Sequence, residues 1–282
     1  MGYAANLAQS AARFMDEVLC VLLPRICPLC RAWALKRDET FCPSCILSFQ
    51  LFEPPFCDIC GIPLPCRSME SGVLCASCLV RSGSLLPGWT ARSIGPYSSN
   101  LRAALLSLKY GRQTLLAPSL GRLLADRFHG LFPTSTFDTV LPVPLHPKRL
   151  REREFNQSLL LARPLARFLK APLDLHSVAR VRNTPSQSLF KGPERRRNLK
   201  GAFQIQATGS IRGKSVLVVD DVYTTGATAE EISRLLQIAG ASRVSVLTVA
   251  RSMETGFIAQ ARSPRANQDR PGVTLDTPDP LD

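Results

Sequence analysis

Two adjacent carboxylates, Asp220 and Asp221, precede a run of small residues in the segment VLVVDDVYTTGAT. The small residues are Thr224, Thr225, Gly226, Ala227 and Thr228. Backbone N–H groups at the start of a helix bind anions, and phosphate suits them best. Carboxylates would repel phosphate, but they accept hydrogen bonds from sugar hydroxyls or hold a cation. A sugar phosphate with vicinal hydroxyls therefore fits both halves of the segment.

The flanks of this segment predict a strand before the acids and a helix after the small residues. Val216–Val219 is a short apolar run, typical of a strand buried on both faces of a parallel sheet. The residues that would share one helix face are Ile232, Leu235, Leu236 and Ala239. Gly240 is a natural stop for that helix. The strand would thus end in the acids, and the small residues would open the helix.

Eight of the ten cysteines form C-x-x-C pairs, and this spacing predicts metal binding. The pairs are Cys27/Cys30, Cys42/Cys45, Cys57/Cys60 and Cys75/Cys78. Two such pairs complete a tetrahedral Cys₄ site, so we expect two structural zinc ions, each shared by neighbouring pairs along the chain. Iron–sulfur centres and disulfides are the alternatives. Cys20 and Cys66 are left over.

The cysteine-rich segment is about fifty residues long and can bury only a small core. Bound metal would have to supply much of its folding free energy, on the order of 10–16 kcal/mol per site. Paired cysteines of this kind favour a reducing compartment, so we expect a cytoplasmic protein. We expect no membrane span, since no apolar run is long enough, and no secretion signal.

The net charge of +13 is concentrated in one region of the chain. Residues 146–200 hold fourteen Lys and Arg but only four acidic residues. Lys148, Arg149 and Arg153 directly follow a predicted strand, Phe137–Val143, where they would suit a pyrophosphate leaving group. A solvated basic turn is the alternative there. The basic region as a whole is equally consistent with a nucleic-acid patch or a soluble basic face.

The order of the predicted elements indicates an α/β fold with a parallel sheet, preceded by a small double zinc ribbon. We expect an N-terminal helix over 1–24, the ribbon over 25–82, a linker over Gly83–Gly88, the α/β domain over 89–253 and a disordered tail over 254–282. Further expected strands are Trp89–Pro96, Ser177–Val181 and Arg243–Ala250, and further expected helices are Leu101–Tyr110, Leu115–Phe128 and Phe155–Leu169. Ligands of such sheets bind at the carboxyl ends of the strands, so the loops after 137–143 and 216–219 should share one crevice.

The segment around Asp220 resembles the phosphoribosyl pyrophosphate (PRPP) signature of type I phosphoribosyltransferases. The resemblance implies that Asp220 and Asp221 hold the two ribose hydroxyls and that Thr224–Thr228 wraps the 5′-phosphate. In 6-oxopurine salvage enzymes an aspartate stands at the position of Thr224, so the resemblance disfavours purine salvage.

Residues 143–157, VPLHPKRLREREFNQ, resemble a motif of the ComF family that usually reads R-G-F-N-Q. Arg153, Asn156 and Gln157 match this motif, whereas Glu154 stands in place of its glycine. The long polar segment Arg182–Lys200 resembles the mobile active-site loop of phosphoribosyltransferases. Its ComF-like residues are Thr184, Gln187, Glu194, Arg195 and Asn198.

The resemblance to ComF proteins implies a phosphoribosyltransferase-like protein that binds PRPP with Mg²⁺ and transfers the phosphoribosyl group to an unknown acceptor. It also implies a role in competence and DNA uptake. The alternative is a non-catalytic module that senses PRPP or a nucleotide and contacts single-stranded DNA or a competence protein. The ribbon has few aromatic residues and no dense basic–aromatic stripe of the kind that stacks on single-stranded DNA.

Overall fold

The structure is a computed structural model that describes residues 26–33, 40–65, 72–81, 88–184, 197–206 and 210–253. The expected N-terminal helix over 1–24, most of the linker, the tail over 254–282, and the residues Cys20, Cys66 and Arg195 lie outside the described residues. The described residues up to Ser252 belong to one compact unit.

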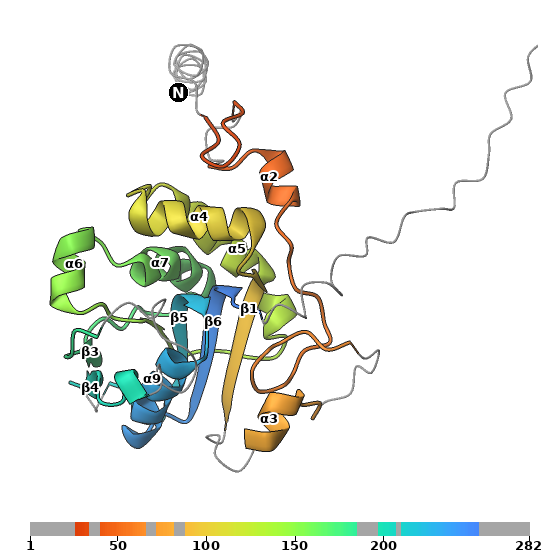
Figure 1. The fold of residues 1–282 in the computed structure, drawn as a ribbon. Coiled ribbons are helices and arrows are strands. Elements are labelled where there is room, and N and C mark those ends of the chain that lie inside the picture. The colour runs from red at the N-terminus through yellow and green to blue at the C-terminus, as the bar shows by residue number, and fades with distance from the viewer. Residues whose placement is uncertain are drawn as a thin grey trace, which may run out of the picture. The chain divides into compact units, whose positions relative to one another are not determined.

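A parallel sheet of four strands forms the centre of this unit (Figure 1). The strands are β1 (Trp89–Pro96), β2 (Thr139–Pro142), β5 (Ser215–Tyr223) and β6 (Arg243–Arg251), in the spatial order β1-β6-β5-β2. All three neighbouring pairs are parallel, so the carboxyl ends of the strands lie along one edge. This arrangement confirms the α/β fold class expected from the sequence.

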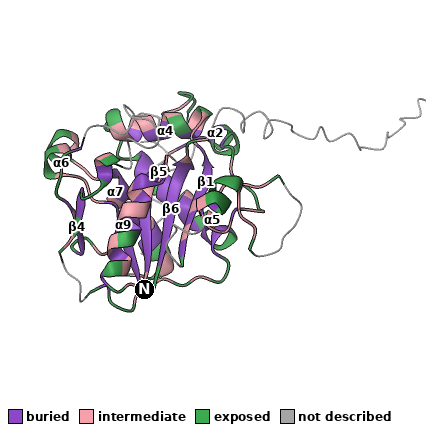
Figure 2. Ribbon diagram, turned by 60° about the horizontal axis from the view of Figure 1, so that its bottom comes forward, coloured by how far each residue is buried: buried purple, intermediate pink, exposed green. Residues whose placement is uncertain are grey.

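Helices cover both faces of the sheet. They are α4 (Ser99–Tyr110), α5 (Leu116–Leu131), α7 (Gln157–Leu169) and α9 (Ala227–Ile238). Leu217 and Val219 of β5 pack into one apolar cluster with α4, α5 and α7. Val216 and Val218 pack into a second cluster with α9. Because successive strand residues point to opposite faces, the continuous apolar run of β5 is needed to fill both clusters (Figure 2).

The structure departs from the sequence-based expectation at three places. β5 does not end at Val219 but continues through both acids to Tyr223, and α9 begins at Ala227, within the expected loop. The expected strand near 177–181 forms as β3 (Val178–Arg180), but it pairs antiparallel with β4 (Phe203–Ile205), away from the parallel sheet.

The third departure is α6 (Pro147–Arg153), which occupies a basic segment that we expected to be a loop. Its start is set by His146, whose Nδ1 accepts a hydrogen bond from the Lys148 backbone at 3.2 Å, and by Pro147 at the first helical position. No apolar periodicity marks the helix, since none of its residues is buried.

The cysteine-rich segment covers the outer edge of β1. Ala91 N donates to Ile59 O at 2.7 Å, and Phe52 N donates to Ile94 O at 2.8 Å. Two short helices, α2 (Pro43–Leu47) and α3 (Ala76–Arg81), each carry the last cysteine of a set of four. The edge strand is therefore paired by backbone groups of the ribbon. Among the described helices, none is long and apolar enough to cross a membrane.

Candidate functional site

A cavity of about 520 Å³ lies where the four parallel strands reach their carboxyl ends. Every strand places lining residues at its end or just beyond it: Tyr97 after β1, Val143 after β2, Asp220, Asp221 and Val222 at the end of β5 with Thr224 after it, and Ser252 after β6. The helices add Lys109, Tyr110, Arg149, Arg153, Gln157 and Thr228. The crevice expected from the sequence is thus present.

Asp221 is almost fully buried in this cavity and forms an ion pair with Lys109 of α4. Burial by itself would raise the pKa of Asp221, but the Lys109 ammonium lowers it below its ordinary value. Burial likewise opposes the charge on Lys109, and Asp221 raises the pKa of the lysine. Each group therefore keeps the other charged. Asp221 consequently enters the site as a paired carboxylate.

Asp220 has a different environment, although it is the adjacent residue. Its Oδ1 accepts hydrogen bonds from Ser158 Oγ at 2.8 Å and from the Asp221 backbone N at 2.9 Å. Burial, reinforced by the nearby charge of Asp221, raises the pKa of Asp220 to about 7. The two acids thus differ in charge near neutral pH, and Asp220 is the carboxyl whose ionisation can respond to a ligand.

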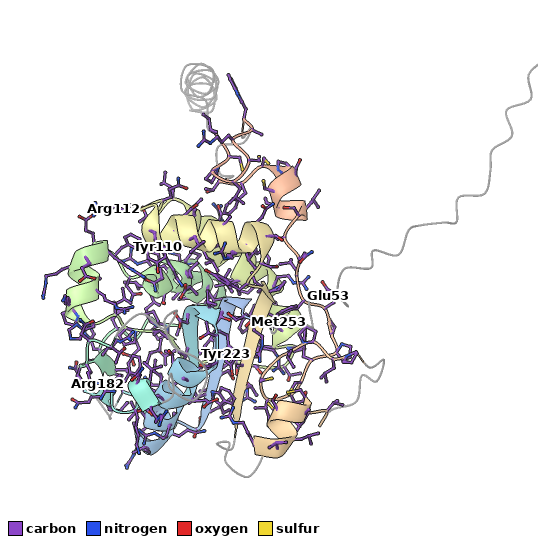
Figure 3. All side chains as sticks on the ribbon, in the orientation of Figure 1. Glu53, Tyr110, Arg112, Arg182, Tyr223 and Met253 are labelled. Carbon is purple, nitrogen blue, oxygen red and sulfur yellow. The ribbon has the colours of Figure 1, made fainter. Side chains whose placement is uncertain are left out.

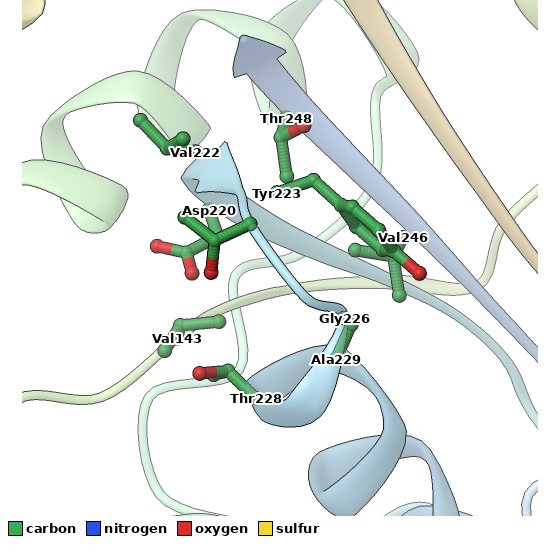
Figure 4. A pocket seen from close by; sticks show the side chains of 10 residues that line it. Val143, Asp220, Val222, Tyr223, Gly226, Thr228, Ala229, Val246 and Thr248 are labelled. Carbon is green, nitrogen blue, oxygen red and sulfur yellow. The ribbon is translucent and has the colours of Figure 1, made fainter. Parts of the chain in front are cut away.

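The turn Thr224–Gly226, which we call the phosphate turn, joins β5 to α9. Gly226 has a φ of +80°, and a Cβ there would overlap the Tyr223 hydroxyl, so only glycine fits without strain. Figure 4 shows Asp220 and Thr228 on one side of the turn and the Tyr223 ring on the other, beside Val246. A space of about 10 Å³, room for roughly one water, lies at the turn itself.

The phosphate turn leads directly into the first helical turn, so the N–H groups of α9 point their partial positive charge toward the same cavity. Thr224 and Thr228 line the cavity, whereas Thr225 does not. The Thr225 hydroxyl is buried without a hydrogen-bond partner among the described residues. Of the three threonines predicted from the sequence, Thr224 and Thr228 therefore face the cavity and Thr225 is directed into the protein.

Arg149 and Arg153 also line the cavity. Arg153 Nη1 donates to Gln157 Oε1 at 3.1 Å, and its guanidinium lies 5.3 Å from the centre of the Tyr110 ring. Arg149 Nη2 donates to Thr184 O at 2.8 Å. Tyr110 is the last residue of α4, and Arg112 follows just after the helix (Figure 3). Lys148 is exposed and does not line the cavity, so of the three basic candidates after β2 only the two arginines are placed in the site.

Arg180 of β3 is a cavity residue that the sequence did not single out. It is buried, its Nη2 donates to Thr184 Oγ1 at 2.6 Å, and its Nε has no partner among the described residues. Burial, reinforced by the nearby charges of Arg149 and Arg153, lowers the pKa of Arg180 to about 10. Three arginines around one space make a strong anion-binding wall.

Asn156 has a structural position at the start of α7. Its Oδ1 accepts from the backbone N of Ser158 at 3.0 Å and of Leu159 at 3.4 Å, and its Nδ2 donates to Val143 O at 3.1 Å. These contacts cap the helix and tie it to the end of β2. Asn156 does not line the cavity at the strand ends, and its expected ligand role stays a prediction.

The backbone conformation at Glu154 explains why the motif usually has a glycine at this position. Its φ is +69°, in the left-handed region that favours glycine, and it ends α6. The side chain is exposed and forms an ion pair with Arg112 at 3.3 Å. The glutamate therefore adopts a strained backbone conformation, and its side chain lies in solvent.

Lys109, Ser158 and Arg180 are the functional residues that sequence reasoning missed. Lys109 and Ser158 lie on predicted helices, where one polar residue gives no signal by itself. Their importance comes from contacts over long separations in the chain, 62 residues for Ser158 and Asp220. A lysine on the otherwise apolar end of the predicted helix Leu101–Tyr110 was the available sign.

The eight paired cysteines form two clusters, Cys27/Cys30/Cys42/Cys45 and Cys57/Cys60/Cys75/Cys78. Within each cluster the sulfur atoms lie within 4.8 Å of one another, and neighbouring pairs along the chain share a cluster as expected. Cys30 and Cys42 sulfurs are 3.4 Å apart, and Cys60 and Cys75 sulfurs 3.6 Å, too far for disulfide bonds. Four convergent thiol groups fit a tetrahedral zinc ion.

Each cluster holds one cysteine whose thiol pKa is lowered, whereas burial raises the thiol pKa of Cys45 and of Cys78. A hydrogen bond from the Cys60 thiol lowers the pKa of Cys57 to about 4. Burial opposes ionisation of Cys27, but backbone N–H groups lower its pKa to about 6. Because thiolates are the zinc ligands, these two cysteines are favourable first contacts for an ion.

Comparison with protein families gives one match for the cysteine-rich segment and one for the α/β domain. Residues 18–79 match the model of the double zinc ribbon domain, and residues 156–261 match the model of the phosphoribosyl transferase domain. Competence protein F of Haemophilus influenzae is 32% identical over 80% of this chain and 96% of its own length. Competence protein ComFC of Bacillus subtilis is 31% identical over 77% of this chain and 87% of its own length. The chain belongs to the ComF family.

Among other ComF relatives, DNA utilization protein YhgH of Escherichia coli O157:H7 is 33% identical over 82% of this chain and 99% of its own length. A solved glutamine PRPP amidotransferase from B. subtilis, complexed with ADP and GMP, is 25% identical over 47% of this chain and 25% of its own, with a TM-score of 0.32. The family models and the parallel sheet, and not this structural likeness, carry the fold assignment.

Proposed function

We propose that this ComF protein binds PRPP at the cavity where the strands end. The observation that carries the proposal is that one cavity is lined by residues of an anion-binding turn, by the Asp220 carboxyl and by the neighbouring arginines Arg149, Arg153 and Arg180. The phosphate turn and the first turn of α9 would bind the 5′-phosphate. Asp220 would accept hydrogen bonds from the ribose hydroxyls, and Asp221 would support it from its ion pair with Lys109.

The pyrophosphate of PRPP would lie against Arg149, Arg153 and Arg180. Guanidinium groups give bidentate hydrogen bonds to phosphate oxygens and stabilise the negative charge that grows as pyrophosphate departs. Mg²⁺ would neutralise part of that charge when it binds with PRPP. The protein itself would bind the 5′-phosphate and the pyrophosphate at two separate places, so that the C1–O bond between them is accessible to the acceptor.

A second cavity of about 550 Å³ adjoins the first, since Leu145 and Arg180 line both. Its lining is mainly apolar and comes from α6, α7 and β3. This space would admit a planar or apolar acceptor next to the ribose. The names of the relatives, DNA utilization protein and competence protein, suggest that the acceptor or partner is connected with DNA.

Isothermal titration calorimetry with PRPP and Mg²⁺ tests the binding. Asp220→Asn and Arg153→Gln should each weaken PRPP binding at least tenfold, whereas Lys148→Gln, an exposed neighbour outside the cavity, should leave it within twofold. Equal affinity in wild type and Asp220→Asn would overturn the site assignment. Release of pyrophosphate on addition of nucleobases or single-stranded DNA would establish transfer, and PRPP binding without release would establish a sensing role.

A further inference from the structure

The second zinc cluster, Cys57/Cys60/Cys75/Cys78, is connected to the phosphate turn by two separate routes. We propose that this cluster positions the phosphate turn, so that zinc bound there controls the affinity of the site for phosphate. The inference rests on the proposed function for its effect on PRPP, but the structural coupling can be measured without any ligand.

The first route runs through Arg251, the last residue of β6. Arg251 Nη1 donates to the backbone oxygen of Cys60 at 2.5 Å. The same guanidinium stacks on the ring of Tyr223, with 4.4 Å between its carbon and the ring centre. Tyr223 is buried and directly precedes the phosphate turn. Cys60, an expected zinc ligand, is therefore linked to Tyr223 through a single residue, Arg251, and Tyr223 is bonded directly to Thr224.

The second route runs through α3. This helix carries Cys78, and three residues later Arg81 forms an ion pair with Glu230 at 2.9 Å. Glu230 lies in the first turn of α9 and donates its backbone N–H to Gly226 O at 2.8 Å. Both side chains of the ion pair are partly shielded from solvent. The ribbon thus holds the first turn of the helix that the phosphate turn opens.

The two routes meet at Gly226. A Cβ at this residue would collide with the Tyr223 hydroxyl and would come within 3.2 Å of Glu230 Oε1. The turn is therefore closed between Tyr223, which Arg251 holds, and Glu230, which Arg81 holds. Displacement of either residue opens space beneath the turn and releases its N–H groups from their common orientation.

Zinc is what fixes the ribbon end of both routes. Among the described residues, the cysteines of the second cluster pack in a small apolar cluster with four partly buried residues: Ile59, Ile62, Leu64 and Leu74. Such a small apolar cluster cannot by itself hold α3 and the Cys57–Cys60 turn together. Without the ion, Cys60 O and Arg81 would lose their fixed positions relative to the sheet.

The first cluster provides an internal control. Cys27, Cys42 and Cys45 pack with the apolar residues of α4 and α5. Its segment also contacts the start of α5, where Thr40 Oγ1 donates to Leu115 O at 3.1 Å. Two further side-chain hydrogen bonds tie this segment to the same two helices, from Ser119 Oγ of α5 to Thr40 Oγ1 and from Asn100 Nδ2 of α4 to Ser48 Oγ. Loss of zinc from the first cluster should therefore leave the turn unchanged.

Hydrogen–deuterium exchange of the 224–228 amides, measured on the full-length protein, tests the coupling. Cys78→Ser and Cys45→Ser should each lower the zinc content by one ion per chain. Only Cys78→Ser should raise exchange at the turn, by at least tenfold, and weaken PRPP binding about as much. Equal exchange in the two variants would overturn the proposal.

A charge exchange tests the second route with both zinc ions retained. Arg81→Glu and Glu230→Arg should each raise exchange at the turn at least threefold, and the double variant should restore it. A merely structural role of either residue predicts additive damage instead, which would contradict positioning. If wild-type protein fails to bind PRPP, the proposed function fails, whereas the exchange measurements still decide the coupling.

Discussion

Lys109 of α4 and Asp221 of β5 form a buried ion pair that joins a helix to the acidic end of the central strand. The lysine side chain is 17% exposed and the aspartate 6%. The pair brings residues 112 positions apart into contact. Because Lys109 lowers the pKa of Asp221, this carboxylate stays ionised when the pH changes near neutrality. Asp220 is left as the titrating member of the two.

Removing the lysine should be costly because it leaves a buried carboxylate unpaired. We expect Lys109→Met to lower the free energy of unfolding at pH 7.5 by about 3–5 kcal/mol. In the wild type the low pKa of Asp221 gives stability that is present above the unfolded pKa and is lost as the pH falls through the folded value. In the variant the carboxyl can accept a proton, so the deficit should shrink toward pH 4.

Urea unfolding at pH 4.5 and 7.5 measures this difference. Lys109→Met/Asp221→Asn is the matched control and should recover much of the loss, since neither charge remains. A deficit in Lys109→Met that is the same at both pH values would show that the pair is not electrostatically important.

The affinity for PRPP should depend on pH through Asp220. Burial raises the folded pKa of Asp220 to about 7, so the group is protonated below this value and folding takes up a proton between about pH 4 and 7. In the proposed site the ionised carboxylate would bind both ribose hydroxyls better, since both of its oxygens are acceptors. Binding should therefore strengthen about tenfold from pH 6 to pH 8, as the ionised fraction rises.

Phosphate groups of the ligand also titrate in this range, so the control is essential. Asp220→Asn should bind PRPP more weakly at pH 8 and should retain only the part of the pH dependence that belongs to the ligand. Calorimetry at several pH values separates the two. Parallel pH profiles for wild type and variant would assign the titration to the ligand alone.

The left-handed backbone at Glu154 should be relieved by glycine. We expect Glu154→Gly to raise the free energy of unfolding by about 1 kcal/mol, because its φ of +69° costs a side-chain-bearing residue that amount. The exposed ion pair with Arg112 offsets little of this gain. Glu154→Ala keeps the strain and loses the ion pair, so it should not stabilise. Thermal and urea unfolding of the two variants decide the matter.

The ribbon should carry two zinc ions per chain, measurable by elemental analysis. The four sulfurs of each cluster lie within 4.8 Å of one another. When a chelator removes zinc, thiolates at this distance should repel one another, and neutral thiols should lose their fixed arrangement. We expect a lower thermal midpoint and faster proteolysis within residues 26–81. A protein that keeps its midpoint after complete zinc removal would show that the ribbon folds without metal.

The sequence was most informative where one residue type repeats at a fixed spacing. The apolar run before Asp220 predicted a doubly buried strand, and the C-x-x-C spacing predicted the grouping of cysteines that the structure shows. Both depend on local geometry, which neighbouring residues determine. The same holds for the carboxyl-edge cavity, because parallel strands place their ends together.

What could not be predicted depends on contacts between distant segments. Lys109 and Arg180 looked like ordinary basic residues until the fold placed them in the cavity. α6 lacks apolar periodicity because it lies on the surface, so its pattern resembles a loop. Asn156 matched a motif, but its side chain caps a helix, a role that the motif alone does not distinguish from ligand binding.

The backbone pairing of β1 with Ile59 and Phe52 has a consequence for dissecting the protein. β1 is the terminal strand of the sheet, and a bare strand edge recruits strands of other molecules. A fragment that starts at residue 88 would display the N–H of Ala91 and the carbonyl of Ile94 as an open template. Expressed alone, the α/β part should self-associate, and the ribbon in the full chain would prevent this by covering the strand edge.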